Sequence, residues 1–501
     1  MRALHLPYTQ LPGPARTPAP VLPEAPEAPE AVPAEARGGW RIPAMARCWM
    51  TLAVVSLVLA GLLSLGVVLG RIPWISPFIA DPLFFQRCLV VHVNLALAVW
   101  FHAFIAAITW RAFGTAAAAV NRRVFGAAVA GVVLMLGGAL VPEAQPVLAN
   151  YIPVIDHWLF LGGLGLFFFA VFAHASSLVV RAQTTAGGVS AEAAAALRAA
   201  LAALLLAGAA WLGGQLWIPD GTGRLAYFEF SAWGAGHVLQ VANVCAMLAV
   251  WLWIVRRLTG RNVLPARTAA VLFTLLVLPH ALVPLFAVVP AWQHHYIHGS
   301  TQLMRWAIFP VVLIVLGWTF VRLRARTEPS TTEQSALLAA FYASAGLTLL
   351  GFLLGAMIRG SSTLIPAHYH AALGGVTVAF MAGAFLFAAD AARRDGRGGL
   401  CAAFWGRARL QMFLFGGGQA LFAVGFGIGG LYGLGRKEYG ADQVVRGAGE
   451  LAGLGLMGTG GLLAAAGGVL FLVLILREVF RWWRVHLPLP SSGINQKPIQ
   501  Q

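Results

Sequence analysis

The sequence predicts an all-α, polytopic membrane protein whose fold is a bundle of twelve transmembrane helices. Of its 501 residues, 59% are hydrophobic and only 10% are charged, and the mean hydropathy is +0.77. This composition excludes an ordinary soluble globular protein. Apolar runs recur along the chain, and each approaches the length of about 20 residues that a helix needs to cross a bilayer. Short polar loops separate the runs, so we expect each run to form one span.

Twelve such runs follow one another, and no soluble domain is visible between them. The first run is too long and too far from the N-terminus for a cleaved signal peptide, so we expect it to remain in the membrane. The runs define a membrane domain at residues 47–482. The twelve expected spans are residues 48–70, 88–111, 124–142, 153–180, 196–217, 229–255, 268–291, 303–321, 336–358, 366–391, 410–434 and 452–476.

The two ends of the chain differ from the spans in composition. Residues 1–46 are rich in Pro, Ala and Glu, as in the stretch APVLPEAPEAPEAVPAEA, and they show no apolar periodicity. Such a segment cannot bury enough apolar surface to fold, so we expect a disordered tail. Residues 483–501 form a second, shorter tail after the last span.

The net charge of +16 comes mainly from arginines in the loops between spans, and it therefore indicates membrane topology rather than nucleic-acid binding. Loops after even-numbered spans carry more than twice as many basic residues as loops after odd-numbered spans. The positive-inside rule places the even loops and both tails in the cytoplasm. We expect a multi-pass protein of a bacterial inner membrane. The four cysteines are widely spaced without a CxxC, and predict neither a disulfide framework nor a thiolate metal site.

Six histidines lie in four of the expected spans, all toward the outer membrane face. An ionisable side chain is costly inside a membrane unless it has a partner, and imidazole is a common ligand of haem iron and copper. Their convergence therefore predicts metal centres toward the outer side. The six are His92 at the start of span two, His237 about two turns into span six, His294 and His295 at the end of span seven, and His368 and His370 at the start of span ten.

The spacing within each histidine pair limits what the pair can bind. His368 and His370 are two residues apart, so on a regular helix their side chains point about 200° apart and must serve different centres. His294 and His295 are adjacent and can share one metal only where the helix ends, which is where they lie. These limits allow one copper ion and two haems: copper on His237, His294 and His295, one haem on His368, and one haem between His92 and His370.

The motifs around these histidines resemble those of subunit I of the haem–copper oxidase superfamily, which includes cytochrome c oxidases and nitric oxide reductases. They are VHVN, WGAGHVLQ, WQHH and PAHYH, and the resemblance covers about residues 48–480. It implies a low-spin haem held by His92 and His370 and a high-spin haem held by His368. The His-x-Asn that begins at His92 is similar to the nitric oxide reductase and cbb3-type branches. The copper ligands that the resemblance implies are His237, His294 and His295.

Departures from the family pattern bear on the substrate. Many oxidases carry a tyrosine four residues after the copper ligand of span six, where this chain has Val241. Typical nitric oxide reductases carry a glutamate about one turn beyond that ligand, where the polar residues here are Gln240 and Asn243. The cbb3 type supplies its tyrosine from span seven, and Tyr296 is the candidate catalytic residue here. The missing tyrosine favours NO chemistry, and the missing acid favours copper over non-haem iron.

Two further charged residues have both a functional and a simpler interpretation, and a third bears on the path of protons. Arg305 follows the copper motif and is either a contact of a haem propionate or a surface charge. Glu229 lies two turns before His237, where it either delivers protons or marks the membrane boundary. Asp390, at the inner end of span ten, is one of very few acidic residues in the inner halves of the spans. We therefore expect catalytic protons to enter from the outer side, with little or no proton pumping.

The sequence thus predicts a membrane respiratory oxidoreductase that reduces a small diatomic gas at a high-spin haem and copper, with NO reduction to N2O as the first choice. Reduction of O2 to water by a cytochrome c oxidase type of enzyme is the alternative. A non-catalytic haem protein, or a transporter, which twelve spans also suit, is a more distant alternative. The chain has no CxxCH and no binuclear copper motif, so we expect electrons from a partner subunit, cytochrome c or a quinol.

Overall fold

The structure is a computed structural model of the chain. It describes residues 42–69, 81, 83–114, 118–179, 189–326, 330–360, 362–435, 445 and 447–484. Residues 1–41 and 485–501, which make up most of the two predicted tails, lie outside the described residues. The first helix begins at Ala44 and the last ends at Arg484.

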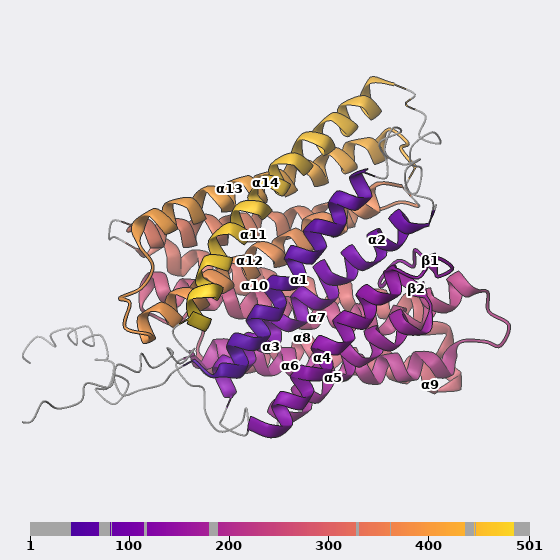
Figure 1. The fold of residues 1–501 in the computed structure, drawn as a ribbon, viewed down its shortest axis with the longest axis horizontal. Coiled ribbons are helices and arrows are strands. Elements are labelled where there is room, and N and C mark those ends of the chain that lie inside the picture. Colours follow the sequence, from indigo (N-terminus) through magenta and orange to yellow (C-terminus); the bar gives the residue numbers. More distant parts are fainter. Residues whose placement is uncertain are drawn as a thin grey trace, which may run out of the picture. The chain divides into compact units, whose positions relative to one another are not determined.

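The predicted all-α architecture is confirmed, because the described residues form twelve helical spans that are long and apolar enough to cross a membrane (Figure 1). Three of these spans are built from more than one helical segment: the second, the seventh and the eighth (Pro290–Arg324), in which a short 3-10 helix precedes α10 (Tyr296–Arg324). The single-helix spans are α1 (Ala44–Leu69), α4 (Ala118–Ala139), α5 (Trp158–Val179), α6 (Ala191–Trp217), α7 (Arg224–Thr259), α11 (Thr332–Met357), α12 (Leu364–Arg394), α13 (Ala402–Leu431) and α14 (Ala448–Arg484).

The second span changes helix type directly after His92. The α-helix α2 (Phe84–Val93) continues into the π-helix η3 (Asn94–Val99) and then into α3 (Trp100–Phe113). A π-helical turn shifts the register of the side chains that follow it and is frequent at functional sites.

The seventh span is interrupted at prolines. After α8 (Ala266–Val277), Pro279 lies in the short 3-10 helix η5 (Leu278–Ala281), and α9 (Leu282–Val288) completes the span. Pro290 then opens a second 3-10 helix, η6 (Pro290–His295). Proline lacks a backbone N–H and cannot continue an α-helical ladder, which explains both breaks. The adjacent His294 and His295 therefore lie at a distorted helix end, as the sequence predicts.

The centre of the bundle is formed by α7 and α12. In each of these spans 83% of the most apolar window is buried inside the protein, compared with 33% in α14. These two helices carry three of the six predicted metal-binding histidines. We call the end of the bundle where α2, α7 and α12 begin the outer end, following the predicted topology, and the opposite end the inner end.

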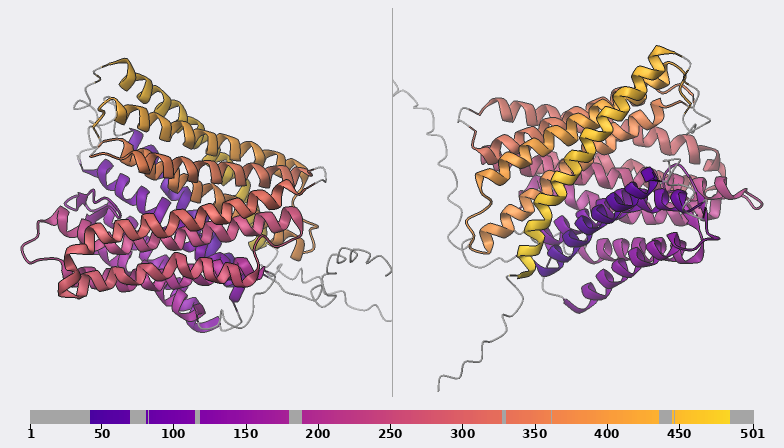
Figure 2. Two further views of the ribbon diagram at one scale, coloured as in Figure 1. Left: turned by 180° about the vertical axis from the view of Figure 1, so that it is seen from behind. Right: turned by 45° about the horizontal axis from the view of Figure 1, so that its top comes forward.

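The helices α13 and α14 lie side by side along most of their length (Figures 1 and 2). Glycines allow this approach: a Cβ atom at Gly453 would lie 2.7 Å from the backbone nitrogen of Gly429, and one at Gly467 would lie 2.5 Å from that of Phe415. Small residues at such contacts are a general device of membrane helix packing. The pair forms the side of the bundle where α14 also contacts α1.

One predicted helix start is wrong. The fourth span was expected from residue 153, but residues Val154–Asp156 form strand β2, which pairs antiparallel with β1 (Gln145–Val147), and α5 begins only at Trp158. The reason is local, because Pro153 and the β-branched pair Val154 and Ile155 favour an extended backbone. The resulting hairpin lies at the outer end in the loop between α4 and α5, which we call the outer loop (residues 140–157).

Candidate functional site

The outer loop is anchored at both ends on the helix that carries His92. Arg87 of α2 is fully buried, and its Nε and Nη1 atoms donate to the carbonyl oxygens of Ala139 and Pro142 at 2.9 and 3.0 Å. Asn94 of η3 donates from Nδ2 to the carbonyl oxygen of Pro153 at 2.7 Å. A buried guanidinium must be satisfied by such partners, so these contacts fix the path of the loop.

An ion pair at the outer end of the second span completes this anchor. Arg87 also pairs with Asp81, just before α2 begins. Desolvation acts to raise the pKa of Asp81, but the hydrogen bond and charge of Arg87, together with hydrogen bonds from the backbone N–H groups of Leu83 and Phe84, lower it. Asp81 is therefore a carboxylate at neutral pH, and it holds the guanidinium that binds the outer loop.

Tyr151 of the anchored loop contacts His237 of α7. The phenol oxygen lies 2.8 Å from His237 Nε2, and the two ring centroids are 4.8 Å apart. His237 Nδ1 lies 2.7 Å from the carbonyl oxygen of Trp233, which can only accept, so Nδ1 carries the proton and Nε2 accepts from the phenol. Burial raises the pKa of Tyr151, so the phenol remains protonated. Thr301 Oγ1 of α10 lies 3.2 Å from the same Nε2 atom.

The neighbouring residue of the loop contacts Glu229. Asn150 donates from Nδ2 to Glu229 Oε1 at 2.7 Å, two turns before His237 on α7. Asp156 of β2 forms an ion pair with Arg224 at the start of the same helix. Three residues of the outer loop thus contact α7. Of their partners on that helix, Glu229 and Arg224 lie closer to its outer end than His237 does.

Three of the predicted metal-binding histidines share one hydrogen-bonding pattern. His92 Nδ1 lies 2.8 Å from the carbonyl oxygen of Ala60 on α1, and His368 Nδ1 lies 2.7 Å from that of Gly351 on α11. His237 has the equivalent bond inside its own helix. Histidines that bind metals characteristically donate one ring N–H to such an acceptor, which orients the ring and leaves Nε2 as the ligand atom. The donor set at these positions therefore fits metal ligands.

His368 and His370 face different neighbours, as their spacing predicts. His368 lies against α11, where a Cβ atom on Gly355 would be only 2.6 Å from its Nδ1 atom, so this position requires glycine. His370 instead lies beside two aromatic rings of α13 that contact each other, with centroid distances of 4.8 Å to Phe422 and 5.5 Å to Phe426. The two imidazoles therefore open toward two separate regions, and His370 has an apolar, aromatic surrounding.

The three predicted copper ligands are not gathered into one cluster. His294 and His295 are exposed on η6, with ring centroids 3.8 Å apart, while His237 is 1% exposed. Within the described ranges, no three His, Cys, Asp or Glu side chains lie close enough to hold one metal ion. As it stands, this arrangement does not fit a three-histidine copper site, and copper ligation by these residues stays a prediction. The electrostatic neighbour of His237 is His280, which is fully buried and has an Nε2 atom without a partner in the described structure.

Tyr296 and Arg305 take positions that the sequence did not specify. Tyr296 is fully buried; its phenol donates to the carbonyl oxygen of Phe230 and accepts from the backbone N–H of Gly234, both at 3.2 Å. It thus fixes the start of α10 on α7, one turn before His237. Arg305 is exposed on α10, and its charge acts on His368.

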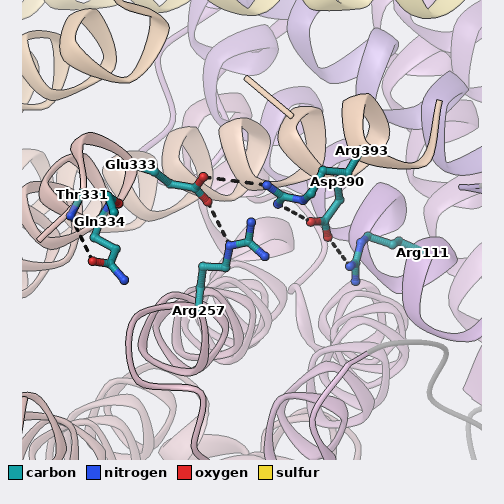
Figure 3. Close-up of polar contacts among 7 residues, drawn as sticks. All are labelled: Arg111, Arg257, Thr331, Glu333, Gln334, Asp390 and Arg393. Carbon is teal, nitrogen blue, oxygen red and sulfur yellow. Dashed lines mark hydrogen bonds and ion pairs between the residues drawn. The ribbon is translucent and has the colours of Figure 1, made fainter. Parts of the chain in front are cut away.

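The inner end contains a different kind of cluster (Figure 3). Asp390 of α12 forms ion pairs with Arg111 of α3 and, at 2.8 Å, with Arg393. Arg393 reaches Glu333 of α11 at 3.8 Å, and Glu333 pairs with Arg257 of α7 at 2.9 Å. This chain of ion pairs links four helices. Asp390 lies between two guanidinium groups and thereby joins α12 to α3 at the inner end, which we call the inner clamp.

Tyr151 and Asn150 are the site residues that sequence reasoning missed. No short motif marks them, because their contacts join residues 86 and 79 positions apart. The one signal in the sequence was the group Pro153-Val154-Ile155, which indicates an extended segment where a helix was expected.

Comparisons with known proteins place this geometry in context. No family model matches the chain. An uncharacterized protein of Aquifex aeolicus is 26% identical over 343 residues, which cover 68% of this chain and 83% of that protein. An uncharacterized protein of Rickettsia prowazekii is 22% identical over 496 residues, covering 87% of this chain and 96% of that protein.

A solved structure gives the fold. The cryo-EM structure of a heme-copper terminal oxidase dimer superimposes with a TM-score of 0.56 and 16% sequence identity, over 89% of this chain and 85% of that chain. The likeness extends over nearly all of the bundle that carries the six histidines. The chain is therefore a multi-pass membrane protein with a fold related to that of a heme-copper terminal oxidase.

Proposed function

We propose that this protein is the catalytic subunit of a membrane respiratory oxidoreductase that reduces NO to N2O. The observation that carries the proposal is the common orientation of His92, His237 and His368. These histidines come from three spans, lie toward one end of the bundle, and each use Nδ1 on a backbone carbonyl. This pattern leaves Nε2 as the ligand atom and supports metal ligation, and the packing histidines His102 and His280 make the same kind of bond to a carbonyl oxygen.

The proposed cofactors are two haems and one copper ion; the copper ion is proposed from the sequence alone, because His237, His294 and His295 are not gathered together among the described residues. His92 and His370 would hold the low-spin haem, and His368 the high-spin haem. Arg305, which is exposed on α10, would contact a haem propionate. When bound at His368, the high-spin haem would supply the redox chemistry for reducing a diatomic molecule. Electrons would reach the protein from a partner subunit, a cytochrome c or a quinol.

The chain's own contribution is to position groups and hold protons at the outer end. Glu229 is half-buried at the outer surface and bonded to Asn150, and the next residue, Tyr151, holds its phenol proton against His237 Nε2. Formation of N2O from two NO molecules consumes two protons. The half-buried Glu229 and the phenol of Tyr151 form one polar connection from the outer surface to His237, which supports proton entry from that side.

The choice of NO over O2 rests on the surroundings of His237. Val241, one turn further along α7, is fully buried in the apolar core. The phenol of Tyr296 is occupied by the backbone of α7 rather than by a histidine. Neither residue supplies the tyrosine that the oxidase pattern requires.

A second candidate function is O2 reduction to water, and a specific contact favours it. The phenol of Tyr151 lies 2.8 Å from Nε2 of His237, so a tyrosine does stand beside a predicted metal ligand, although it comes from another part of the chain. Such a tyrosine is placed to give up the fourth electron and a proton that O2 cleavage needs.

The deciding experiment is turnover of the purified full-length protein with a chemical electron donor. We expect two haems and one copper per chain, and N2O production under anaerobic NO that exceeds O2 consumption in air. Two haems with no copper and no turnover would instead identify a protein that only relays electrons. A protein without haem would favour the alternative that the chain is a transporter.

The variant Tyr151→Phe separates the two substrates. If NO is the substrate, N2O production should fall but continue, since the variant loses one polar group of the proton connection and no source of electrons. If O2 is the substrate, the same variant should lose O2 consumption. Tyr227→Phe is the matched control, because Tyr227 is also at the outer end but bonds to Gln215.

A further inference from the structure

A basic cavity opens at the inner end, far along the chain from the histidines. It has a volume of about 360 Å³ and lies where the loop after α12 meets the start of α13 and the end of α14. A smaller cavity of about 220 Å³ adjoins it through shared residues at the end of α14. The residues that line the larger cavity include four arginines and one carboxylate: Arg397, Arg407, Arg477, Arg481 and Glu478.

The single carboxylate that lines the cavity already forms ion pairs with two of the arginines. Glu478 is buried, with a side chain 2% exposed, and its two oxygens bind Arg397 Nη1 at 2.9 Å and Arg481 Nη1 at 2.6 Å. The Nε and Nη2 atoms of Arg397 are buried and have no partner in the described part of the chain. Buried guanidinium N–H groups without an acceptor are costly. The cavity therefore has an excess of positive charge and donors without an acceptor.

The loop backbone is built to present Arg397. Gly396, Gly398 and Gly399 have φ angles of 77°, 70° and 116°, a backbone region that residues other than glycine rarely adopt. The Arg397 N–H closes the turn on the carbonyl oxygen of Ala392 at 2.9 Å. These turns reverse the chain directly after α12, and they place Arg397 at the cavity between α13 and α14.

The remaining walls are apolar and lie at the membrane boundary. Leu400, Phe404 and Leu474 line the cavity, and Phe480 of α14, 63% exposed, lines the adjoining one. Trp483 follows at the end of the same helix, 41% exposed, where aromatic residues characteristically meet the lipid headgroups. The arginine distribution places this end in the cytoplasm, where the bilayer surface is anionic.

We propose that this cavity binds an anionic phospholipid of the cytoplasmic leaflet. Its phosphate would bind the guanidinium groups that line the cavity, those of Arg407 and Arg477 among them, and an acyl chain would lie along Phe404 and Leu474. Basic pockets between transmembrane helices on the cytoplasmic side are a known form of lipid headgroup site. The proposal does not depend on the proposed function, since it involves none of the histidines.

Cys401 provides a direct reporter of occupancy. It is exposed and lines the cavity, whereas Cys88 and Cys245 are buried. The full-length protein is placed in nanodiscs of phosphatidylcholine alone or with added phosphatidylglycerol, and the rate of maleimide labelling is measured. The variant Cys401→Ala identifies the signal of this thiol. We expect phosphatidylglycerol to slow labelling of Cys401 at least five-fold, and equal rates in the two lipids would overturn the proposal.

Arginine variants test where the lipid binds. An arginine near an anionic lipid contributes enough that removing one should raise the phosphatidylglycerol concentration for half-protection about five-fold. We expect this for Arg397→Gln and for Arg407→Gln; the second variant leaves the ion pairs of Glu478 intact and so preserves folding. Arg324→Gln, exposed at the inner end of α10, is the matched control and should change nothing. An equal loss in the control would show a diffuse surface effect and contradict the site.

A last arm separates a lipid from a free anion. Inorganic phosphate is added at millimolar concentration to the protein in phosphatidylcholine nanodiscs. We expect no protection of Cys401, because phosphate lacks the acyl chains that cover the apolar walls. Protection equal to that of phosphatidylglycerol would overturn the assignment to a lipid.

Discussion

The two ends of the bundle are held together by different chemistry. At the outer end the contacts that position the histidines are neutral: backbone carbonyls accept from His92 and His368, and a phenol donates to His237. At the inner end the helices are joined by ion pairs such as Arg111–Asp390 and Arg397–Glu478. The ion pairs of the outer end that involve Asp81 and Asp156 hold the outer loop.

This difference has a physical consequence for function. Removing one partner of a buried ion pair leaves a charge in a low-dielectric region and costs several kcal/mol, so ion pairs make the inner end hard to rearrange. A neutral hydrogen bond to a histidine costs far less to exchange. Another ligand could therefore displace the Tyr151 phenol from Nε2 of His237 at low cost, whereas the ion pairs at the inner end hold their helices in a fixed arrangement.

The largest effect is expected from the haem ligands. His92→Ala or His370→Ala should remove the low-spin haem entirely, because an axial ligand has no substitute, while the twelve spans still insert. The optical band of the low-spin haem and the haem content per chain measure this. His298→Ala, an exposed histidine at the outer end, is the control and should keep both. A surviving low-spin band in both variants would reject the assignment.

The inner clamp should give the next largest effect. Asp390→Asn leaves Arg111 and Arg393 without their shared carboxylate, and Arg111 is buried, so we expect a loss of about 3 kcal/mol in the free energy of unfolding. Glu333→Gln in the same network is more exposed and should cost about 1 kcal/mol or less. Denaturation in detergent measures both. Equal losses would remove the distinction between a buried clamp and a surface pair.

Asp390→Asn also tests the path of protons. In liposomes of native orientation, the wild type should generate little membrane potential during turnover if electrons and protons both arrive from the outer side. The turnover of folded Asp390→Asn protein should match the wild type. A large potential in the wild type that the variant abolishes would establish a proton path through the inner end.

A smaller effect is expected at the outer loop. Tyr151→Phe removes the phenol from His237 Nε2, which should cost about 1 kcal/mol of stability. Because a ligand no longer has to displace that phenol, the same variant should bind added copper several-fold more tightly. Metal titration of metal-free protein checks this, with His237→Ala as the variant that should bind none at this position. Weaker copper binding by Tyr151→Phe would make the phenol a supporting group rather than a competitor.

The smallest effect is a pH dependence of the loop anchor. The folded pKa of Asp81 is lower than its ordinary value of 3.8, so its ion pair with Arg87 stabilises the fold fully above that value. This contribution is lost as the pH falls below 3.8 through the lower folded pKa. Amide exchange in the outer loop should then accelerate in acid. In Asp81→Asn the exchange should already be faster at neutral pH and should lack this acid transition.

Hydropathy and spacing predicted the parts of this fold that depend on neighbouring residues. Each apolar run is long enough to cross the bilayer, so all twelve spans follow from composition alone. The separation of His368 from His370 follows from helix geometry, and the distorted end at His294 follows from the two prolines before it. These features are properties of single helices.

The remaining features depend on contacts between distant segments, which a periodicity does not encode. Tyr151 reaches His237 only because Arg87 and Asn94 fix the loop between them. Arg397 was counted only as a charge that sets topology, because its cavity exists only where α13 and α14 meet the loop. The separation of His294 from His237 likewise depends on how η6 is held, through its Gln293 carbonyl, by Trp217.

The contacts of Tyr151 and Thr301 with His237 also form in a definite order while the chain is synthesised. Tyr151 leaves the ribosome long before His237, and Thr301 leaves it last, so the three-residue contact closes only after the eighth span begins to insert. Before that point Thr301 does not contact Nε2 of His237, and a metal ion bound by this proposed ligand would have fewer groups to displace. Afterwards, loading requires local opening of an outer loop that is pinned by Arg87 and Asn94. Delivery during biogenesis and delivery to the finished protein are thus different reactions, and the second is limited by how often the loop opens.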